Sequence, residues 1–240
     1  MRLVAWNILQ GAPKRGPQVA SALLAHSPDL VILTEFHPVK SRPIAHALES
    51  AGLRHQLAAP AGYGYEVFMA SRAPLRAQPQ ADESVAGGYL EAEHPEQRMV
   101  VAGVYVPVIA AVPLAEKRRF WGKLHDAAHR HRDRPYLVIG DWNTGDFPLD
   151  KEQPTRAFTC TREYRQMKEL GFEEAWRSLN DEQREYTWTS NRGHGFRIDH
   201  AFLSPMLRPR LVGARYSHDE RYAKISDHSV MIVELLSAAP

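Results

Sequence analysis

The sequence has little cysteine, no long hydrophobic run and no secretory signal. Its single cysteine, Cys160, excludes an internal disulfide and a zinc site built on cysteines. The longest uncharged run, residues 99–115, contains two prolines and is shorter than the roughly 18 residues of a membrane helix, so it predicts a buried strand and then a loop. Because a strand-like segment follows Met1 directly, we expect a cytoplasmic protein without a transmembrane segment.

Charge of one sign is also lacking, and lysine is scarce. The net charge is +2, from 30 basic and 28 acidic residues, so the charge balance alone does not indicate a polyanionic partner. Arginine outnumbers lysine 23 to 7, which fits either the base composition of the gene or a need for bidentate phosphate contacts. The basic segment 117–134 is open to two interpretations, a nucleic-acid-binding patch or a solvated helix face.

Short apolar runs, separated by turn residues and helix-like stretches, organise the 240 residues. Several runs are apolar at consecutive positions, which is typical of strands covered on both faces. We therefore expect one α/β domain spanning residues 1–240. The predicted strands are 2–8, 30–35, 65–71, 88–93, 98–106, 136–140, 197–204, 211–216 and 229–235, and the predicted helices are 16–26, 42–51, 114–130 and 161–170.

Single polar residues end or interrupt these apolar strands. A carboxylate at the end of a buried strand carries a desolvation cost unless a cation, a donor or a base neutralises it. One such residue is commonly a cap or a turn former, but a repeated arrangement indicates that the strand ends converge on one acidic pocket. The residues in question are Asn7, Glu35, Asp141, Asn143, Asp199, Asp227 and His228.

These side chains are of the types needed for metal binding and for acid–base catalysis. Glu35 with other oxygen donors suits a hard cation such as Mg²⁺. Asp199 could hold the imidazole of His228 in one tautomer, while Asp141 takes a proton from water and Asn143 donates to an anionic oxygen. Together they predict metal-assisted hydrolysis of a phosphate ester. Spacing alone leaves a structural calcium site open.

Six segments around these residues resemble the endonuclease/exonuclease/phosphatase superfamily, the exonuclease III-like metallohydrolases. They follow the order of the family and span nearly the whole chain. The resemblance implies a four-layer α/β/β/α sandwich with two packed mixed β-sheets and the active site at one end. The segments are 6–8, 28–35, 104–107, 140–143, 197–200 and 226–229.

The resemblance also implies a cofactor and its ligands. Glu35 is similar to the principal Mg²⁺ ligand of the family, with Asn7 beside it and Asp227 near the metal. Mn²⁺ would be able to replace Mg²⁺ in such a site.

Catalytic and phosphate-binding roles follow from the same resemblance. Asp141 would position or deprotonate the attacking water, with Asn143 as its partner at the phosphate. His228 would contact the scissile phosphate, oriented by Asp199, and Tyr105 would support the transition-state charge or the leaving group. The glycine-flanked segment 191–195 reads either as a turn or as a substrate loop that brings Arg192 to the substrate phosphate.

The substrate expected from this reading is DNA. Segments 171–177 and 186–188 resemble DNA-repair members, which implies an endonuclease or a 3′-5′ exonuclease, including an abasic-site nuclease. We expect the protein to be a monomer. Three departures leave abasic-site recognition open: Phe36-His37 after Glu35, the apolar segment 108–110, and His200. The alternatives are a phosphatase or phosphodiesterase for a small metabolite or lipid headgroup, and an inactive binding module. Trp142 and Trp188 could stack on bases or pack in the core.

Overall fold

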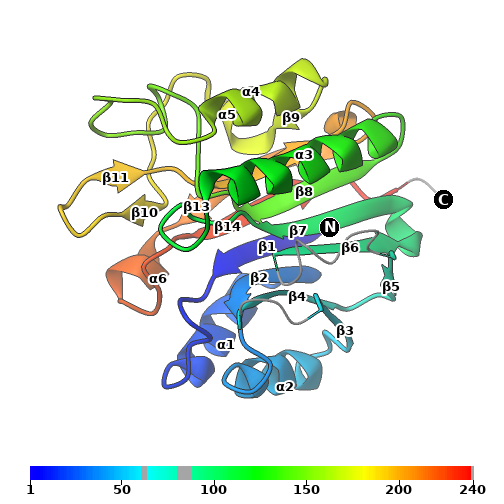
Figure 1. Cartoon of the computed structure of the whole chain (residues 1–240). Helices are drawn as coiled ribbons and strands as arrows, with labels where there is room; N and C mark the ends of the chain where they lie inside the picture. The colour runs from blue at the N-terminus through cyan, green and yellow to red at the C-terminus, as the bar shows by residue number, and fades with distance from the viewer. Residues whose placement is uncertain (61–63, 80–87, 239–240) are drawn as a thin grey trace.

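Two six-stranded mixed sheets form the centre of the computed structural model, which describes residues 1–60, 64–79 and 88–238 (Figure 1). In spatial order, the first sheet contains β13 (Leu211–Ser217), β14 (Val230–Leu235), β1 (Arg2–Asn7), β2 (Leu30–Phe36), β4 (Glu66–Ser71) and β3 (His55–Ala58). The second contains β5 (Arg76–Ala77), β6 (Tyr89–His94), β7 (Met99–Tyr105), β8 (Tyr136–Asp141), β12 (Asp199–Leu203) and β9 (Glu173–Glu174). The pairs β1–β2 and β7–β8 are parallel, and the others are antiparallel.

Helices cover the outer face of each sheet (Figure 1). The first sheet packs on α1 (Gly16–Ala25) and α2 (Arg42–Ser50), and the second on α3 (Leu114–His131) and α4 (Thr161–Glu169). Shorter elements are α5 (Ala175–Asn180), α6 (Asp219–Tyr222), the 3₁₀ helices η2 (Pro95–Gln97) and η3 (Arg208–Arg210), and the hairpin β10 (Trp188–Thr189) and β11 (Gly195–Phe196). Within the described ranges, no helix is long and apolar enough to span a membrane. The predicted four-layer α/β/β/α architecture is confirmed.

Alternate side chains of the central strands serve two different apolar layers. In β2, Leu30 and Ile32 join the cluster between the sheets, whereas Val31 and Leu33 join the cluster beneath α1 and α2. This two-sided burial explains why the strand is apolar at consecutive positions. Trp142 is fully buried in the cluster beneath α3 and α4, so it packs in the core and is not available to bases.

Every predicted strand and helix is present, with its ends within two residues of the predicted ones. Among the described residues, the elements that the sequence did not predict are β3, β5, β9, β10, β11, α5, α6 and the 3₁₀ helices η2 and η3. Each of them is short, from two to six residues, and lacks a sustained apolar period.

Gly140 allows β7 and β8 to approach closely beside the acidic strand ends. Its φ is +147°, and a Cβ atom at this position would lie 2.1 Å from the carbonyl oxygen of Val104. A larger residue would therefore push the strands apart. The glycine keeps Asp141 in register with Tyr105 on the neighbouring strand.

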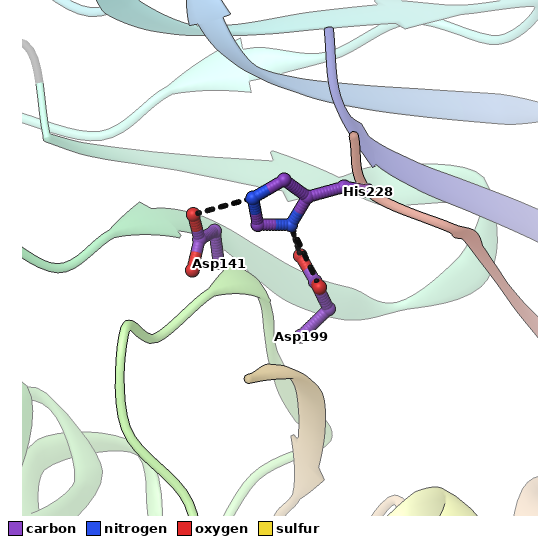
Figure 2. A group of neighbouring side chains, drawn as sticks. All are labelled: Asp141, Asp199 and His228. Carbon is purple, nitrogen blue, oxygen red and sulfur yellow. Dashed lines mark hydrogen bonds and ion pairs between the residues drawn. The ribbon is translucent and has the colours of Figure 1, made fainter. Parts of the chain in front are cut away.

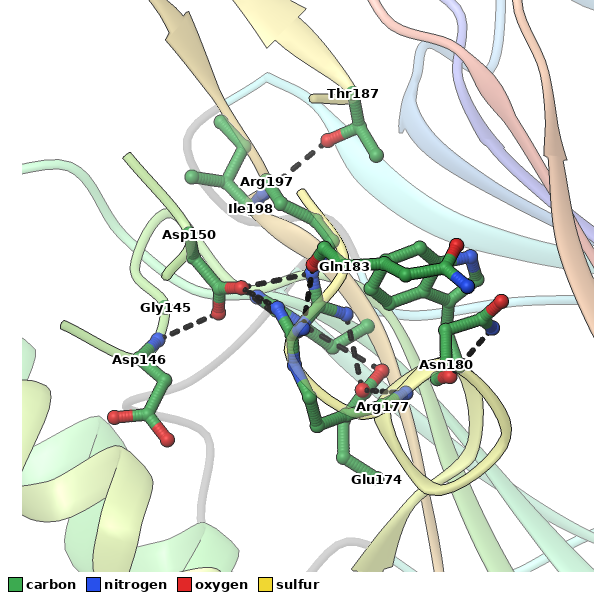
Figure 3. A network of polar contacts seen from close by, with 12 residues as sticks. Gly145, Asp146, Asp150, Glu174, Arg177, Asn180, Gln183, Thr187, Arg197 and Ile198 are labelled. Carbon is green, nitrogen blue, oxygen red and sulfur yellow. Dashed lines mark hydrogen bonds and ion pairs between the residues drawn. The ribbon is translucent and has the colours of Figure 1, made fainter. Parts of the chain in front are cut away.

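A buried ionic network ties the start of β12 to the segment after β8 and to α5 (Figure 3). The fully buried Arg197 donates through Nε to Asp150 Oδ1 at 2.9 Å and through Nη1 to Glu174 Oε2 at 2.9 Å. Arg177 Nη2 also donates to Asp150 Oδ1, at 2.6 Å. Because Arg197 lies two residues before Asp199, the network fixes the backbone that enters the acidic site.

We expect this network to make the fold sensitive to acid. Burial opposes ionisation of Glu174, but the charge of Arg197 and the neighbouring His200, whose Nδ1 lies 3.6 Å from Glu174 Oε1, hold its pKa well below 4.5. A lowered pKa stabilises the folded state above the unfolded value and loses that contribution as the pH falls through the folded value. The thermal midpoint of the native protein should therefore fall as the pH drops below about 4.5. In E174Q the slope of thermal midpoint against pH should be shallower over the same range. E173Q, at the partly exposed neighbour, is the control. Equal slopes for E174Q and the native protein would contradict the prediction.

Candidate active site

The polar strand ends meet at one edge of the two facing sheets. Asn7 ends β1, Tyr105 ends β7 and Asp141 ends β8. Asp141 pairs directly with Tyr105 in the parallel ladder and with Asp199 in the antiparallel ladder to β12. Register therefore places these side chains side by side. His228 lies just before β14 in the other sheet and faces the same edge.

Figure 2 shows His228 between two carboxylates. Its Nδ1 donates to Asp199 at 2.9 and 3.2 Å, and its Nε2 lies 3.9 Å from Asp141 Oδ2. Burial lowers the pKa of His228, but the charges of Asp199 and Asp141 outweigh burial and raise it to about 10. The imidazole is therefore a cation at neutral pH.

Asp141 has its pKa raised to about 7, chiefly by burial, with the charge of His228 opposing the shift. Ligand atoms of Asp141, Asp199 and His228 lie within 4.8 Å of one another, a spacing that also suits a metal ion. The protonated ring, however, offsets only part of the negative charge of the two acids and points its Nδ1 proton at Asp199. A protonated imidazole has no free lone pair for a metal ion, so in this state His228 is not a metal ligand.

Asn7 joins the two sheets at the site. Its Nδ2 donates to Glu35 Oε1 at 3.0 Å and to Asp141 Oδ2 at 3.0 Å. The Tyr105 hydroxyl also donates to Glu35 Oε1, at 3.1 Å, and burial together with the charges of Glu35 and Asp141 raises the pKa of this phenol. The amide and the phenol thus hold the Glu35 carboxylate in a fixed position.

Glu35 adopts an unusual backbone conformation. Its φ is +55°, in the left-handed region, where the register of β2 against β4 shifts between Leu33 and Phe36. Such a conformation costs on the order of 1–3 kcal/mol in a residue other than glycine and is found most often at functional sites. The irregularity leaves Glu35 half-buried, unlike the buried residues on either side of it.

Asp227 supplies a carboxylate oxygen without a partner. Trp188 Nε1 donates to Asp227 Oδ2 at 2.9 Å, whereas Oδ1 is buried and has no hydrogen bond among the described residues. The charge of Asp227 also contributes to raising the pKa of Tyr105 and of His228, which places it near both. A buried carboxylate oxygen is costly without a donor or a cation, so this atom fits a metal ligand.

Asn143 is fixed by the turn after β8. Its backbone N–H donates to Asp141 Oδ1 at 2.9 Å, and its Nδ2 donates to the carbonyl of Val106 at 2.9 Å. Lys117 Nζ donates to the Asn143 carbonyl at 3.0 Å. Lys117 is therefore buried against the site, and the solvated-face interpretation is wrong for this residue of α3.

Arg192 is the one predicted site residue that the structure does not bring to the cluster. It is exposed in the turn of the β10–β11 hairpin, and no hydrogen bond or ion pair joins it to the other site residues in the described part of the chain. Ser226 was not predicted as a site residue, yet its Oγ donates to the Asn7 carbonyl at 2.6 Å and ties the segment before β14 to β1. Its position next to Asp227 in segment 226–229 was the available signal.

The fold and the acidic edge are those of a phosphoric ester hydrolase. The sequence matches the profile of the Endonuclease/Exonuclease/phosphatase family over residues 4–228, and the chain belongs to this family. A comparison with curated proteins gives no match.

Three solved structures share this fold over 98% of the chain and 99% of their own. They are a 3′ phosphatase from Neisseria bound to a product DNA hairpin (21% identity, TM-score 0.84), an AP endonuclease from Archaeoglobus fulgidus (20%, 0.85) and a 3′-5′ exonuclease from Neisseria meningitidis (22%, 0.84).

Proposed function

We propose that the protein is a Mg²⁺-dependent phosphodiester hydrolase acting on DNA as an exonuclease III-like nuclease. The observation that carries the proposal is the hydrogen-bonded chain from Glu35 through Asn7 to Asp141, which continues to the His228–Asp199 pair. The carboxylates of Glu35 and Asp141 and the imidazole of His228 thus meet at one edge of the sheets, which supports a metal ligand, a base and a charged donor in one site. The titles of the similar structures, which name a DNA hairpin, an AP endonuclease and an exonuclease, support DNA as the substrate.

The residues present fit a hard cation. Glu35, Asn7 and Asp227 would hold Mg²⁺, because all three offer oxygen and Asp227 Oδ1 is buried without a partner. When bound, the ion would neutralise negative charge that develops on the phosphate.

Side chains of the protein carry out proton transfer, phosphate binding and support of the leaving group. Asp141, with its pKa raised by burial, accepts the proton of the attacking water. The His228 imidazolium, held by Asp199, donates to a phosphate oxygen. Tyr105 supports the leaving group through its hydroxyl, and Asn143 contacts the phosphate.

Arg192 would contact a substrate phosphate from the hairpin turn, where it is exposed. We propose that residues 1–240 act as a single domain and as a monomer in the cytoplasm, in DNA repair.

Removal of the Glu35 carboxylate should abolish the tight binding of Mg²⁺. E35Q retains the shape of the side chain but loses the charge that attracts the ion. Isothermal calorimetry should detect Mg²⁺ binding to the native protein and at least tenfold weaker binding to E35Q. The control is E49Q, an exposed glutamate of α2, which should bind as the native protein does. Equal affinities for E35Q and E49Q would remove Glu35 from the metal site.

The substrate is tested by a direct comparison. The purified protein with Mg²⁺ is given labelled duplexes, intact or with one abasic site, beside a panel of phosphorylated metabolites and lipids. DNA cleavage without turnover of the panel is expected. Turnover of a small phosphoester without DNA cleavage would replace the nuclease with a phosphatase.

A further inference from the structure

A pocket of about 410 Å³ opens next to the acidic site. One wall comes from the segment after β7, with Val108 and Ile109, and the other from residues 151–159 between β8 and α4. Asn143 lines this pocket and also donates to Asp141 through its backbone N–H. A ligand that fills the pocket therefore lies beside the reacting group.

All the charged side chains that line the pocket are positive. Lys117, Lys151 and Arg156 line it, and within the described ranges none of the three forms an ion pair with a carboxylate. Lys117 and Lys151 are buried, and burial lowers the pKa of both. Each ammonium donates to one backbone carbonyl, of Asn143 and of Arg156 respectively. Since an ammonium has three N–H bonds, both keep donors for a ligand.

Aromatic rings connect this pocket to the catalytic histidine. Lys151 Nζ lies 4.3 Å from the ring centre of Phe158, which packs at 5.9 Å on Phe196. Phe196 lies 5.7 Å from Trp188, and Trp188 lies 6.5 Å from His228. The same wall thus offers apolar surface as well as cations. Phosphate with an attached sugar and base has this mixed character.

We propose that this pocket binds a second phosphate of a nucleic-acid strand, the one next to the scissile phosphate, with its nucleoside against Ile109 and Phe158. The inference rests on the proposed function and adds a specificity: the substrate is a phosphodiester chain rather than an isolated phosphoester. Lys151 and Arg156 provide the phosphate contacts, and Lys117 links the pocket to Asn143.

The test compares the double variant K151Q/R156Q with the native protein in binding and in turnover. Binding of a fluorescent oligothymidylate is measured by anisotropy in EDTA over a range of salt concentrations, so that no hydrolysis is needed. We expect K151Q/R156Q to bind about tenfold more weakly. The slope of log binding constant against log salt concentration should also be smaller in magnitude by about 0.7, because one phosphate contact is lost. R54Q, an exposed arginine beyond α2, is the matched control and should bind as the native protein does.

Turnover with Mg²⁺ gives the second readout. The ratio of kcat/KM for the oligonucleotide to that for bis(4-nitrophenyl) phosphate should fall about tenfold in K151Q/R156Q. Thymidine 3′,5′-bisphosphate should compete at least tenfold more weakly than the oligonucleotide for the native protein. Equally strong competition by thymidine 3′,5′-bisphosphate would show that the pocket binds a small bisphosphate, and it would overturn the proposal that the pocket binds a nucleic-acid strand.

The two proposals can fail separately. Hydrolysis of DNA with unchanged binding and ratio in K151Q/R156Q would overturn the second-phosphate pocket and leave the nuclease intact. Oligonucleotide binding that the double variant weakens, in a protein that hydrolyses no DNA, would overturn the nuclease and support the pocket.

Discussion

D141N should lower kcat for phosphodiester cleavage by about 10²–10⁴-fold while the protein remains folded. The amide has the shape of the carboxylate but cannot accept a proton from water. Its oxygen can still accept the Asn143 N–H bond that the carboxylate accepts at 2.9 Å. The loss of a buried charge removes a desolvation cost, but the amide nitrogen no longer accepts the Asn7 bond that Asp141 Oδ2 accepts at 3.0 Å, so we expect a decrease of only a few degrees in the thermal midpoint. Single-turnover kinetics and thermal unfolding measure the two effects.

The control for this variant is D146N, five residues along the same segment. Asp146 pairs with Arg165 and Lys168 at the surface and does not reach the site. Its activity should stay within about twofold of the native value. A D141N protein as active as D146N would show that another group removes the proton.

The largest effect on stability is expected from R197M. The substitution leaves the carboxylates of Asp150 and Glu174 in the interior, with Arg177 as the remaining charged partner of Asp150. Loss of one partner of a buried ion pair costs about 3–5 kcal/mol. For a protein of this size, that corresponds to a decrease in thermal midpoint of roughly 6–20 °C. Differential scanning fluorimetry would measure it directly.

R208M is the matched control. Arg208 pairs with Glu173 at 2.8 Å, but Arg208 is exposed and Glu173 is partly exposed, so the midpoint should not change measurably. The double variant R197M/E174Q should lose less stability than the sum of its single variants, since it removes one of the stranded charges. Equal midpoints for R197M and R208M would contradict a stabilising role for the buried network.

The sequence could predict that the site residues lie together, because each of these polar residues ends or interrupts a strongly apolar strand. Glu35 follows four apolar residues and Thr34, and Asp141 follows three apolar residues and a glycine. Such strands end at one edge of a sheet, so their polar residues meet there. The order of the strands and the packing of two sheets came from the resemblance to a family, since a local pattern does not determine which strands pair.

What sequence could not predict depends on contacts between distant segments. Arg197 and Glu174 are 23 residues apart, and nothing in either segment indicates that their side chains pair in the interior. Lys117 lies in a segment with the apolar period of an amphipathic helix, at a position expected to face solvent. It is buried because the turn at Asn143 packs against it. Trp188 lies in a two-residue strand, too short for a period, and only the fold brings it to Asp227.

The most direct test of the account follows the oxygen of the attacking water. A duplex with one abasic site is incubated with the protein and Mg²⁺ in oxygen-18 water, and the products are analysed by mass spectrometry, with EDTA as the control. We expect strand cleavage that requires Mg²⁺ and leaves one oxygen-18 atom on the product phosphate. An uncleaved duplex, or a label on the sugar instead of the phosphate, would contradict it.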